Sequence, residues 1–210
     1  MPATKTRFWD SAARKYAVQP LADPAAYERT LERTRRYLKN TDVAVEFGCG
    51  TGTTALKLAP AAARIVASDI SPEMVAIGRE KAEAEGVKTV EFAVATPETA
   101  PWPDASFDVA LGFNLLHLIE ARQAALANVH RLLKPGGLFI SKTPCLADAN
   151  PIYRVIVPVM RLAGKAPYVA FFSDADLERE IVAAGFEIIE RDRHGSKPRD
   201  PRPFLVARRT

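Results

Sequence analysis

The stretch from Val43 to Thr54 constrains the fold of this chain most, because an apolar run there ends in an acidic residue and then breaks into alternating glycines. The order VAVEFGCGTGTT is typical of a buried strand, a tight turn and the start of a helix at Thr53. Glycine can adopt positive φ, and without a Cβ it lets a ligand approach the backbone closely. The sequence therefore predicts a ligand-binding loop formed by Gly48, Gly50 and Gly52, with the first amides of the helix pointing toward the same ligand.

The loop alone does not identify its ligand, since the segment from Gly50 to Ala55 also fits the dinucleotide fingerprint G-x-G-x-x-G/A. Glu46 lies two residues before the first glycine, where its carboxylate would repel a pyrophosphate and attract a cation. A second apolar run ends in Asp69, at about the spacing of a carboxylate that binds a ribose hydroxyl pair. The ligand expected from the two acids is a ribose-containing molecule with positive charge.

S-adenosylmethionine meets this description, because it carries an ammonium and a sulfonium group and no phosphate. The run Glu46-Phe-Gly48-Cys-Gly50-Thr-Gly52 resembles E/D-x-G-x-G-x-G, the first motif of the class I (Rossmann-like) S-adenosylmethionine-dependent methyltransferases. The chain is similar to that family from about Val43 to Arg193, and it looks like the small-molecule branch of the ubiquinone and menaquinone biosynthesis type. The resemblance implies a doubly wound, mostly parallel seven-stranded α/β sheet with an antiparallel last strand, helices on both faces and a helical cover at the N-terminus.

Apolar runs alternate with helical patterns along the rest of the chain, which by itself indicates a parallel, doubly wound sheet. Strands are expected at residues 87–94, 108–113 and 138–141, and the runs 186–191 and 203–208 are expected to pair as an antiparallel hairpin. The chain has 210 residues, of which 48% are hydrophobic, so residues 1–210 are expected to form a single domain.

The N-terminal segment, residues 1–40, is expected to cover the cofactor. It contains two helical patterns, at residues 8–18 and 24–39, with Trp9 and Tyr16 as expected aromatic walls. The alternative is that both helices only pack against the sheet or its neighbours.

Residues 146–172 form the most apolar insertion of the chain, with Arg154, Arg161 and Lys165 among its apolar side chains. These charges and Pro158 argue against a membrane-spanning helix. The segment is either additional core or a lid over an apolar substrate, with a possible contact to a membrane surface. We favour the lid.

The family resemblance implies cofactor contacts for individual residues. Glu46 and the loop amides would hold the methionine end, Asp69 the ribose, and Ile70 and Thr96 the adenine. The run 95–108 resembles the family's G-D-A-E-x-L-P-F-P-D-x-S-F-D-V, but Thr96 stands where the family has aspartate, and its neutral hydroxyl accepts a weaker hydrogen bond. The expected cofactor-binding residues are Tyr16, Glu46, Phe47, Gly48, Cys49, Gly50, Gly52, Thr53, Asp69, Ile70, Met74, Thr96, Pro97, Glu98 and Asn114.

His117 follows the fourth expected strand at its carboxyl end, where ligands of open α/β sheets bind. Its ordinary pKa lies near neutrality, so His117 is a candidate catalytic general base, and packing or helix capping is the alternative. The run from Asn150 to Tyr153 resembles the N-P-P-Y of amino-group methyltransferases but follows the fifth strand instead of the fourth. Cys145 resembles the nucleophile of cytosine C5 methyltransferases but lacks an evident acid partner, so we expect a small buried apolar residue there.

Composition narrows the partners of the chain. The net charge of +4 is scattered, which argues against a nucleic-acid ligand, and Cys49 and Cys145 fit neither a metal site nor a disulfide framework. Without an evident signal peptide or membrane span, the expected location is the cytoplasm. The sequence says nothing about oligomeric state.

The expected activity is S-adenosylmethionine-dependent methyl transfer by in-line displacement to a small, apolar metabolite, yielding S-adenosylhomocysteine. The sequence does not separate O-, N- and C-methylation. Two alternatives remain open, a non-catalytic S-adenosylmethionine-binding module and an NAD-dependent reductase that uses the same glycine-rich loop.

Overall fold

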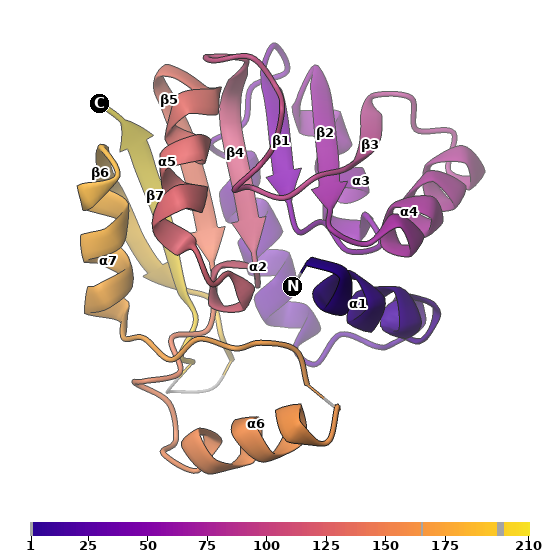
Figure 1. Ribbon diagram of the computed structural model, residues 1–210. Coiled ribbons are helices and arrows are strands. Elements are labelled where there is room, and N and C mark those ends of the chain that lie inside the picture. The colour runs from indigo at the N-terminus through magenta and orange to yellow at the C-terminus, as the bar shows by residue number, and fades with distance from the viewer. Residues whose placement is uncertain (1, 165, 197–199) are drawn as a thin grey trace.

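The computed structural model describes residues 2–164, 166–196 and 200–210, and Lys165 of the expected lid lies outside them. Its centre is a seven-stranded sheet in the order β3-β2-β1-β4-β5-β7-β6. The parallel strands are β1 (Val43–Phe47), β2 (Arg64–Asp69), β3 (Val90–Val94), β4 (Phe107–Phe113) and β5 (Leu133–Lys142) (Figure 1). The last strand, β7 (Pro203–Arg209), is antiparallel to both β5 and β6 (Phe186–Arg193). The expected mostly parallel sheet with an antiparallel last strand is confirmed.

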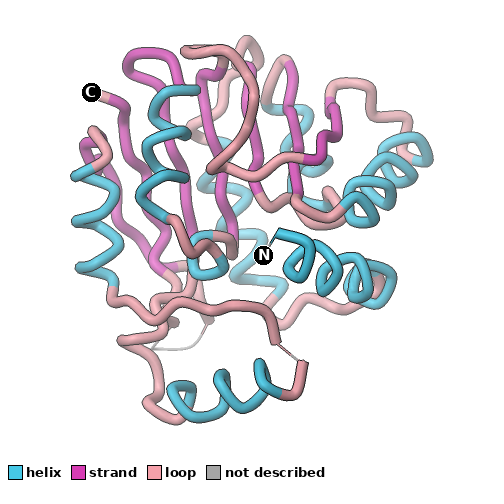
Figure 2. Tube along the Cα trace, in the orientation of Figure 1, coloured by secondary structure: helices cyan, strands magenta, loops and turns pink. Residues whose placement is uncertain are grey.

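Helices cover both faces of the sheet, as Figures 1 and 2 show. One layer contains α5 (Arg122–Leu132) and α7 (Asp174–Ala183), and the other contains α2 (Pro24–Arg35), α3 (Thr53–Leu58) and α4 (Pro72–Ala84). The single-turn 3-10 helices are η1 (Ala59–Ala61) and η2 (Leu116–Leu118). Each central strand sends alternate side chains to opposite faces. In β1, Val45 and Phe47 pack in the layer of α5 and α7, whereas Ala44 packs in the other.

The expected elements are present, but several boundaries moved. Strand β5 begins at Leu133 instead of residue 138. The expected turn at residues 134–137 lies inside the strand, where it interrupts the pairing with β4 between the pairs Phe107–Leu133 and Val109–Leu138. The expected helix over residues 24–39 ends at Arg35.

The first helix, α1 (Pro2–Ala17), lies beside α4 (Figure 1) and is fastened to it by polar contacts. Arg14 donates to Glu73 over 2.8 Å and to Glu80 over 3.0 Å. Asp10 accepts from the Ser71 hydroxyl that caps the start of α4, at 2.5 Å. These contacts hold α1 beside the carboxyl end of β2.

The insertion after β5 contains α6 (Tyr153–Leu162), which lies apart from the layered body (Figure 1). None of its residues is buried, so additional core does not describe this helix. Among the described residues, no helix is both long enough and apolar enough to span a bilayer.

Candidate cofactor and acceptor site

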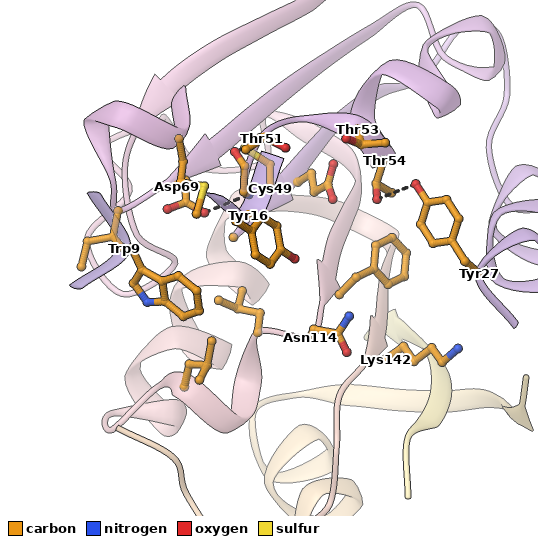
Figure 3. Close-up of a pocket in the computed structure, with 18 of the residues that line it drawn as sticks. Trp9, Tyr16, Tyr27, Cys49, Thr51, Thr53, Thr54, Asp69, Asn114 and Lys142 are labelled. Carbon is orange, nitrogen blue, oxygen red and sulfur yellow. Dashed lines mark hydrogen bonds between the residues drawn. The ribbon is translucent and has the colours of Figure 1, made fainter. Parts of the chain in front are cut away.

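A cavity of about 600 Å³ lies at the carboxyl ends of the parallel strands, under α1 and α2 (Figure 3). Cavities of this size hold small ligands, and this edge of an open α/β sheet is where such ligands bind. The sheet order places the ends of β3, β2 and β1 on one side of the cavity and the ends of β4 and β5 on the other. The reversal of strand order between β1 and β4 is the topological switch point of the fold.

The glycine-rich loop forms one wall in the conformation expected from the sequence. Gly48, Gly50 and Gly52 have φ of 65°, 54° and 76°, in the left-handed region that favours glycine. A Cβ at Gly48 would lie 2.7 Å from Leu115 Cδ1, so the loop packs too closely there for a side chain. Lys81 of α4 supports the loop from outside by donating to the Thr51 hydroxyl over 2.9 Å.

Asp69 ties the end of β2 to this loop. Its Oδ2 accepts from the Gly50 amide and its Oδ1 from the Ser71 amide, both at 2.9 Å. Burial is the main reason that the pKa of Asp69 is raised above its ordinary value. A carboxylate offers about four lone-pair positions, so these two bonds leave capacity for ligand hydroxyls.

Glu46 is a buried acid with one carboxyl oxygen left unsatisfied among the residues that the structure describes. Its side chain is 2% exposed, and within the part of the chain that the structure describes its Oε2 has no hydrogen-bond partner. Burial, together with the nearby Asp69 carboxylate, raises the pKa of Glu46 to about 8. Because a buried polar atom without a partner is costly, a cationic ligand is the group that this position fits.

Side chains of α1 and α4 close the same end of the cavity. Trp9 and Tyr16 line it from α1, and Met74 lines it from α4 (Figure 3). Burial, Asp69 and Glu46 all raise the pKa of the Tyr16 phenol, so this ring stays neutral beside the two acids. Thr96 also lines the cavity, and its hydroxyl lies 3.0 Å from that of Thr99.

The opposite end of the cavity is formed by the expected Asn114 together with residues that sequence reasoning missed, namely Lys142, Thr30 and Tyr27. Lys142, the last residue of β5, donates from Nζ to the Thr30 hydroxyl of α2 over 2.8 Å. Tyr27 lies 3.1 Å from the Thr54 hydroxyl, and Asn114 holds φ of 51° at the end of β4 (Figure 3). One signal was present in the sequence: like Glu46 and Asp69, Lys142 is a charged residue at the end of an apolar strand run.

All of the expected cofactor-binding residues line the cavity except Phe47 and Gly52. Phe47 points to the other face of the sheet, because it is one residue beyond Glu46 in the strand, and its ring packs 5.9 Å from that of Trp102. Gly52 lies beneath Phe92, which would be 2.5 Å from an added Cβ.

The structure does not bring His117 to the cavity wall. Its Nδ1 lies 3.0 Å from the Thr143 hydroxyl, and burial lowers its pKa to about 4. This environment favours the packing alternative for His117. Cys145 is fully buried, as expected.

Residues 45–141 match the family described as "methyltransferase domain". The chain carries a methyltransferase domain. The domain is 37% identical over 97 residues to the demethylmenaquinone methyltransferase of Clavibacter sepedonicus, an alignment that covers 46% of this chain and 38% of that protein. The chain spans less than half the length of the curated relatives it matches.

Solved structures match over more of the chain. A methyltransferase of Thermotoga maritima, described as a possible histamine N-methyltransferase, has a TM-score of 0.73 at 20% identity, covering 98% of this chain and all of that one. The [4+2]-cyclase SpnF has a TM-score of 0.72 at 20% identity, covering 87% of this chain and 80% of that one. Identities this low show the fold alone, which is the class I S-adenosylmethionine-dependent methyltransferase fold. The methyltransferase domain in turn indicates S-adenosylmethionine as its cofactor.

Proposed function

We propose that this protein is an S-adenosylmethionine-dependent methyltransferase that acts on a small-molecule acceptor. The observation that carries the proposal is the buried Glu46 carboxyl, without a described partner for its Oε2, beside a glycine loop and a ribose-type acid. A cationic cofactor without phosphate would satisfy that arrangement, whereas a pyrophosphate would meet two acids.

The cofactor would extend along three neighbouring strand ends. In this arrangement Glu46 and the loop amides hold the methionine end, Asp69 the ribose, and Ile70 and Thr96 the adenine. These residues lie at the carboxyl ends of β1, β2 and β3, which are adjacent in the sheet. The ends of β4 and β5 are then left for the methyl acceptor.

When bound, S-adenosylmethionine supplies an electrophilic methyl group, which the acceptor's nucleophile attacks in line while the C–S electron pair leaves with sulfur. The residues of this chain bind, orient and exclude water. Positioning of that kind can account for about 7–11 kcal/mol of barrier lowering. The cover formed by α1 and α2 contributes Trp9, Tyr16 and Tyr27 to the walls, which keeps water from the reacting groups.

The cofactor assignment is tested at Asp69. Removal of the whole side chain would leave the Gly50 and Ser71 amides without partners, whereas Asp69→Asn keeps an acceptor for one of them and is the milder variant. We expect it to weaken S-adenosylmethionine binding about tenfold or more in calorimetry, because hydrogen bonds to a charged acceptor are lost. Circular dichroism should show an unchanged fold. Undiminished affinity in a folded variant would contradict the assignment.

Two other activities can be tested directly. The fold is shared with a protein named as a cyclase, so the fold by itself does not decide the chemistry. An NAD-dependent reductase should bind NAD in calorimetry, which Glu46 argues against. A non-catalytic binding module should bind S-adenosylmethionine yet form no S-adenosylhomocysteine with any acceptor in a metabolite extract.

For the acceptor we propose a molecule with an apolar body. Leu31, Phe113 and Leu115 line the cavity near the ends of β4 and β5, and the relative from Clavibacter is named for a quinone substrate. Residues 146–172 stay a predicted lid, with α6 as its exposed helical part. A screen of extracts with labelled methyl donor tests the first statement. Deletion of α6 alone, which leaves the buried Ala170 and Phe172 in place, tests the second, since it should raise KM for the acceptor that gives product.

A further inference from the structure

The cavity carries opposite charges at its two ends. Glu46 and Asp69 form the acidic end, whereas Lys142 and Arg202 line the other. Figure 3 shows Lys142 on the far side of the cavity from Asp69. If the acidic end holds a cationic cofactor, as proposed above, the basic end faces the methyl acceptor.

Lys142 is an unusual residue for this position, because a lysine side chain is seldom buried. The residue is 7% exposed, and its Nζ donates to the Thr30 hydroxyl over 2.8 Å. Within the described part of the chain, no carboxylate forms an ion pair with it. An ammonium has three N–H donors, and a buried one without an anion is costly. An anionic ligand would remove that cost.

The nearby carboxylates have other hydrogen-bond donors, although Asp200 Oδ2 has no partner among the described residues. Asp200 accepts from Arg202 Nε over 2.6 Å, and Asp23 accepts from the Ala26 amide over 2.9 Å and from Ser196. Burial is the main cause that lowers the pKa of Lys142 to about 8, with Arg202 acting in the same direction. The local environment therefore disfavours the charged amine until an anion approaches it.

Thr30 fixes the direction of the Lys142 amine. The threonine hydroxyl lies 2.8 Å from the Ala26 carbonyl, to which it donates, and it accepts from Lys142. Thr30 also lies 3.0 Å from His194 Nδ1, so α2 and the segment after β6 hold it from two sides. The amine is thereby oriented by the fold at the end of β5.

We propose that the basic end of the cavity binds a carboxylate of the methyl acceptor, with Lys142 as the principal cation and Arg202 as a second one. A singly charged carboxylate matches one buried ammonium, and the apolar walls formed by Tyr27, Leu31 and Phe113 accommodate the body of such an acid. The acceptor class is thus an apolar or aromatic carboxylic acid. This inference rests on the proposed methyltransferase function.

The test uses matched pairs of aryl carboxylic acids and their primary amides as probes. Binding is measured by calorimetry to protein saturated with S-adenosylhomocysteine, and turnover with labelled S-adenosylmethionine. We compare the wild type with Lys142→Met, Lys142→Arg and the matched control Lys88→Met, an exposed lysine remote from the cavity wall.

Wild type and the Lys88 variant should bind the acids at least about tenfold more tightly than the amides, as expected for a charged hydrogen bond. Lys142→Met should reduce this preference to within about twofold, and Lys142→Arg should restore part of it. The affinity for S-adenosylmethionine should be the same in all variants, because Lys142 lies at the other end of the cavity.

The inference is overturned if wild type binds no acid of the panel, binds amides equally well, or if the preference for acids survives in Lys142→Met. Failure of the proposed function looks different, since the wild type would then either not bind S-adenosylmethionine or bind it and form no S-adenosylhomocysteine with any acceptor. If the protein methylates only neutral acceptors, the proposed methyltransferase function stands and the proposed binding of a carboxylate at the basic end is wrong.

Discussion

At the scale of single residues, we expect Glu46 to couple cofactor binding to the release of a proton. Its pKa of about 8 means that the carboxyl is mostly protonated near pH 7, while an adjacent ammonium favours the carboxylate. Binding should therefore release a proton, and affinity should rise as the pH increases between about 6 and 7.5, below the range where the amine of the ligand itself deprotonates. Calorimetry in buffers that differ in ionisation enthalpy measures how many protons are released on binding.

Glu46→Gln is the control for this coupling. The variant keeps the size of the side chain, and the proton release and most of the pH dependence should disappear. Raised pKa values keep Tyr16 and Cys49 neutral in the same range. If the glutamine variant released as much proton as the wild type, the assignment to Glu46 would be wrong.

At the scale of elements, the strand–turn–helix unit depends on Gly52 although Gly52 does not line the cavity. A Cβ there would meet Phe92 at 2.5 Å in addition to the strain of positive φ, whereas Gly86, with φ of 67°, has open space around it. We expect Gly52→Ala to lower the free energy of unfolding by about 2–4 kcal/mol and Gly86→Ala by about 1 kcal/mol. Urea denaturation measures both changes in the free energy of unfolding. Similar losses in the two variants would show that close packing against Phe92 does not explain the need for Gly52.

Helix α6 exposes an apolar surface that its own chain does not cover. Val155, Val159 and Leu162 are 63%, 60% and 91% exposed, and Arg154 and Arg161 are seven residues apart and so share one side of the helix. Such a helix suits the surface of an anionic membrane, with the arginines at the headgroups.

We therefore predict that α6 binds anionic vesicles. Trypsin should cleave first after Arg154 or Arg161, and phosphatidylglycerol vesicles should protect these bonds while phosphatidylcholine vesicles should not. The variant Val159→Asp should lose sedimentation with anionic vesicles. Val182→Asp, on the exposed face of α7, is the matched control because Val182 is 55% exposed outside α6. Equal loss in both variants would argue against a role of this helix.

At the scale of the whole molecule, the N-terminal cover and the sheet should unfold together. Helix α1 is tied to α4 through Arg14, and α2 is tied to β5 through Thr30 and Lys142. The chain has two tryptophans, Trp9 in the cover and Trp102 against the sheet core, so each can report on its own part. Single-tryptophan variants should show coincident denaturation midpoints.

Saturation with S-adenosylhomocysteine should move both midpoints upward by the same amount. At about 100 times the dissociation constant, linkage adds about 2.7 kcal/mol to the free energy of unfolding. Separate midpoints for Trp9 and Trp102 would instead show that the cover is an independent unit.

The sequence by itself determined the architecture and the acidic end of the site. Apolar strand runs, the turn glycines and the acids that follow the strands are local features, and the carboxyl ends of parallel strands meet at one edge wherever the helices lie. Glu46 and Asp69 could therefore be placed together before any coordinates, and the positive φ of the glycines followed from their lack of a Cβ.

Only the tertiary structure decided which side chains face the cavity and which distant elements meet there. It turned Phe47 to the opposite face of the sheet, placed His117 against Thr143 outside the cavity lining, and brought Thr30 to Lys142 across 112 positions of sequence. These outcomes depend on side-chain direction and on the packing of helices far away along the chain. Local sequence patterns do not encode either quantity, so the basic end of the cavity emerged only from the fold.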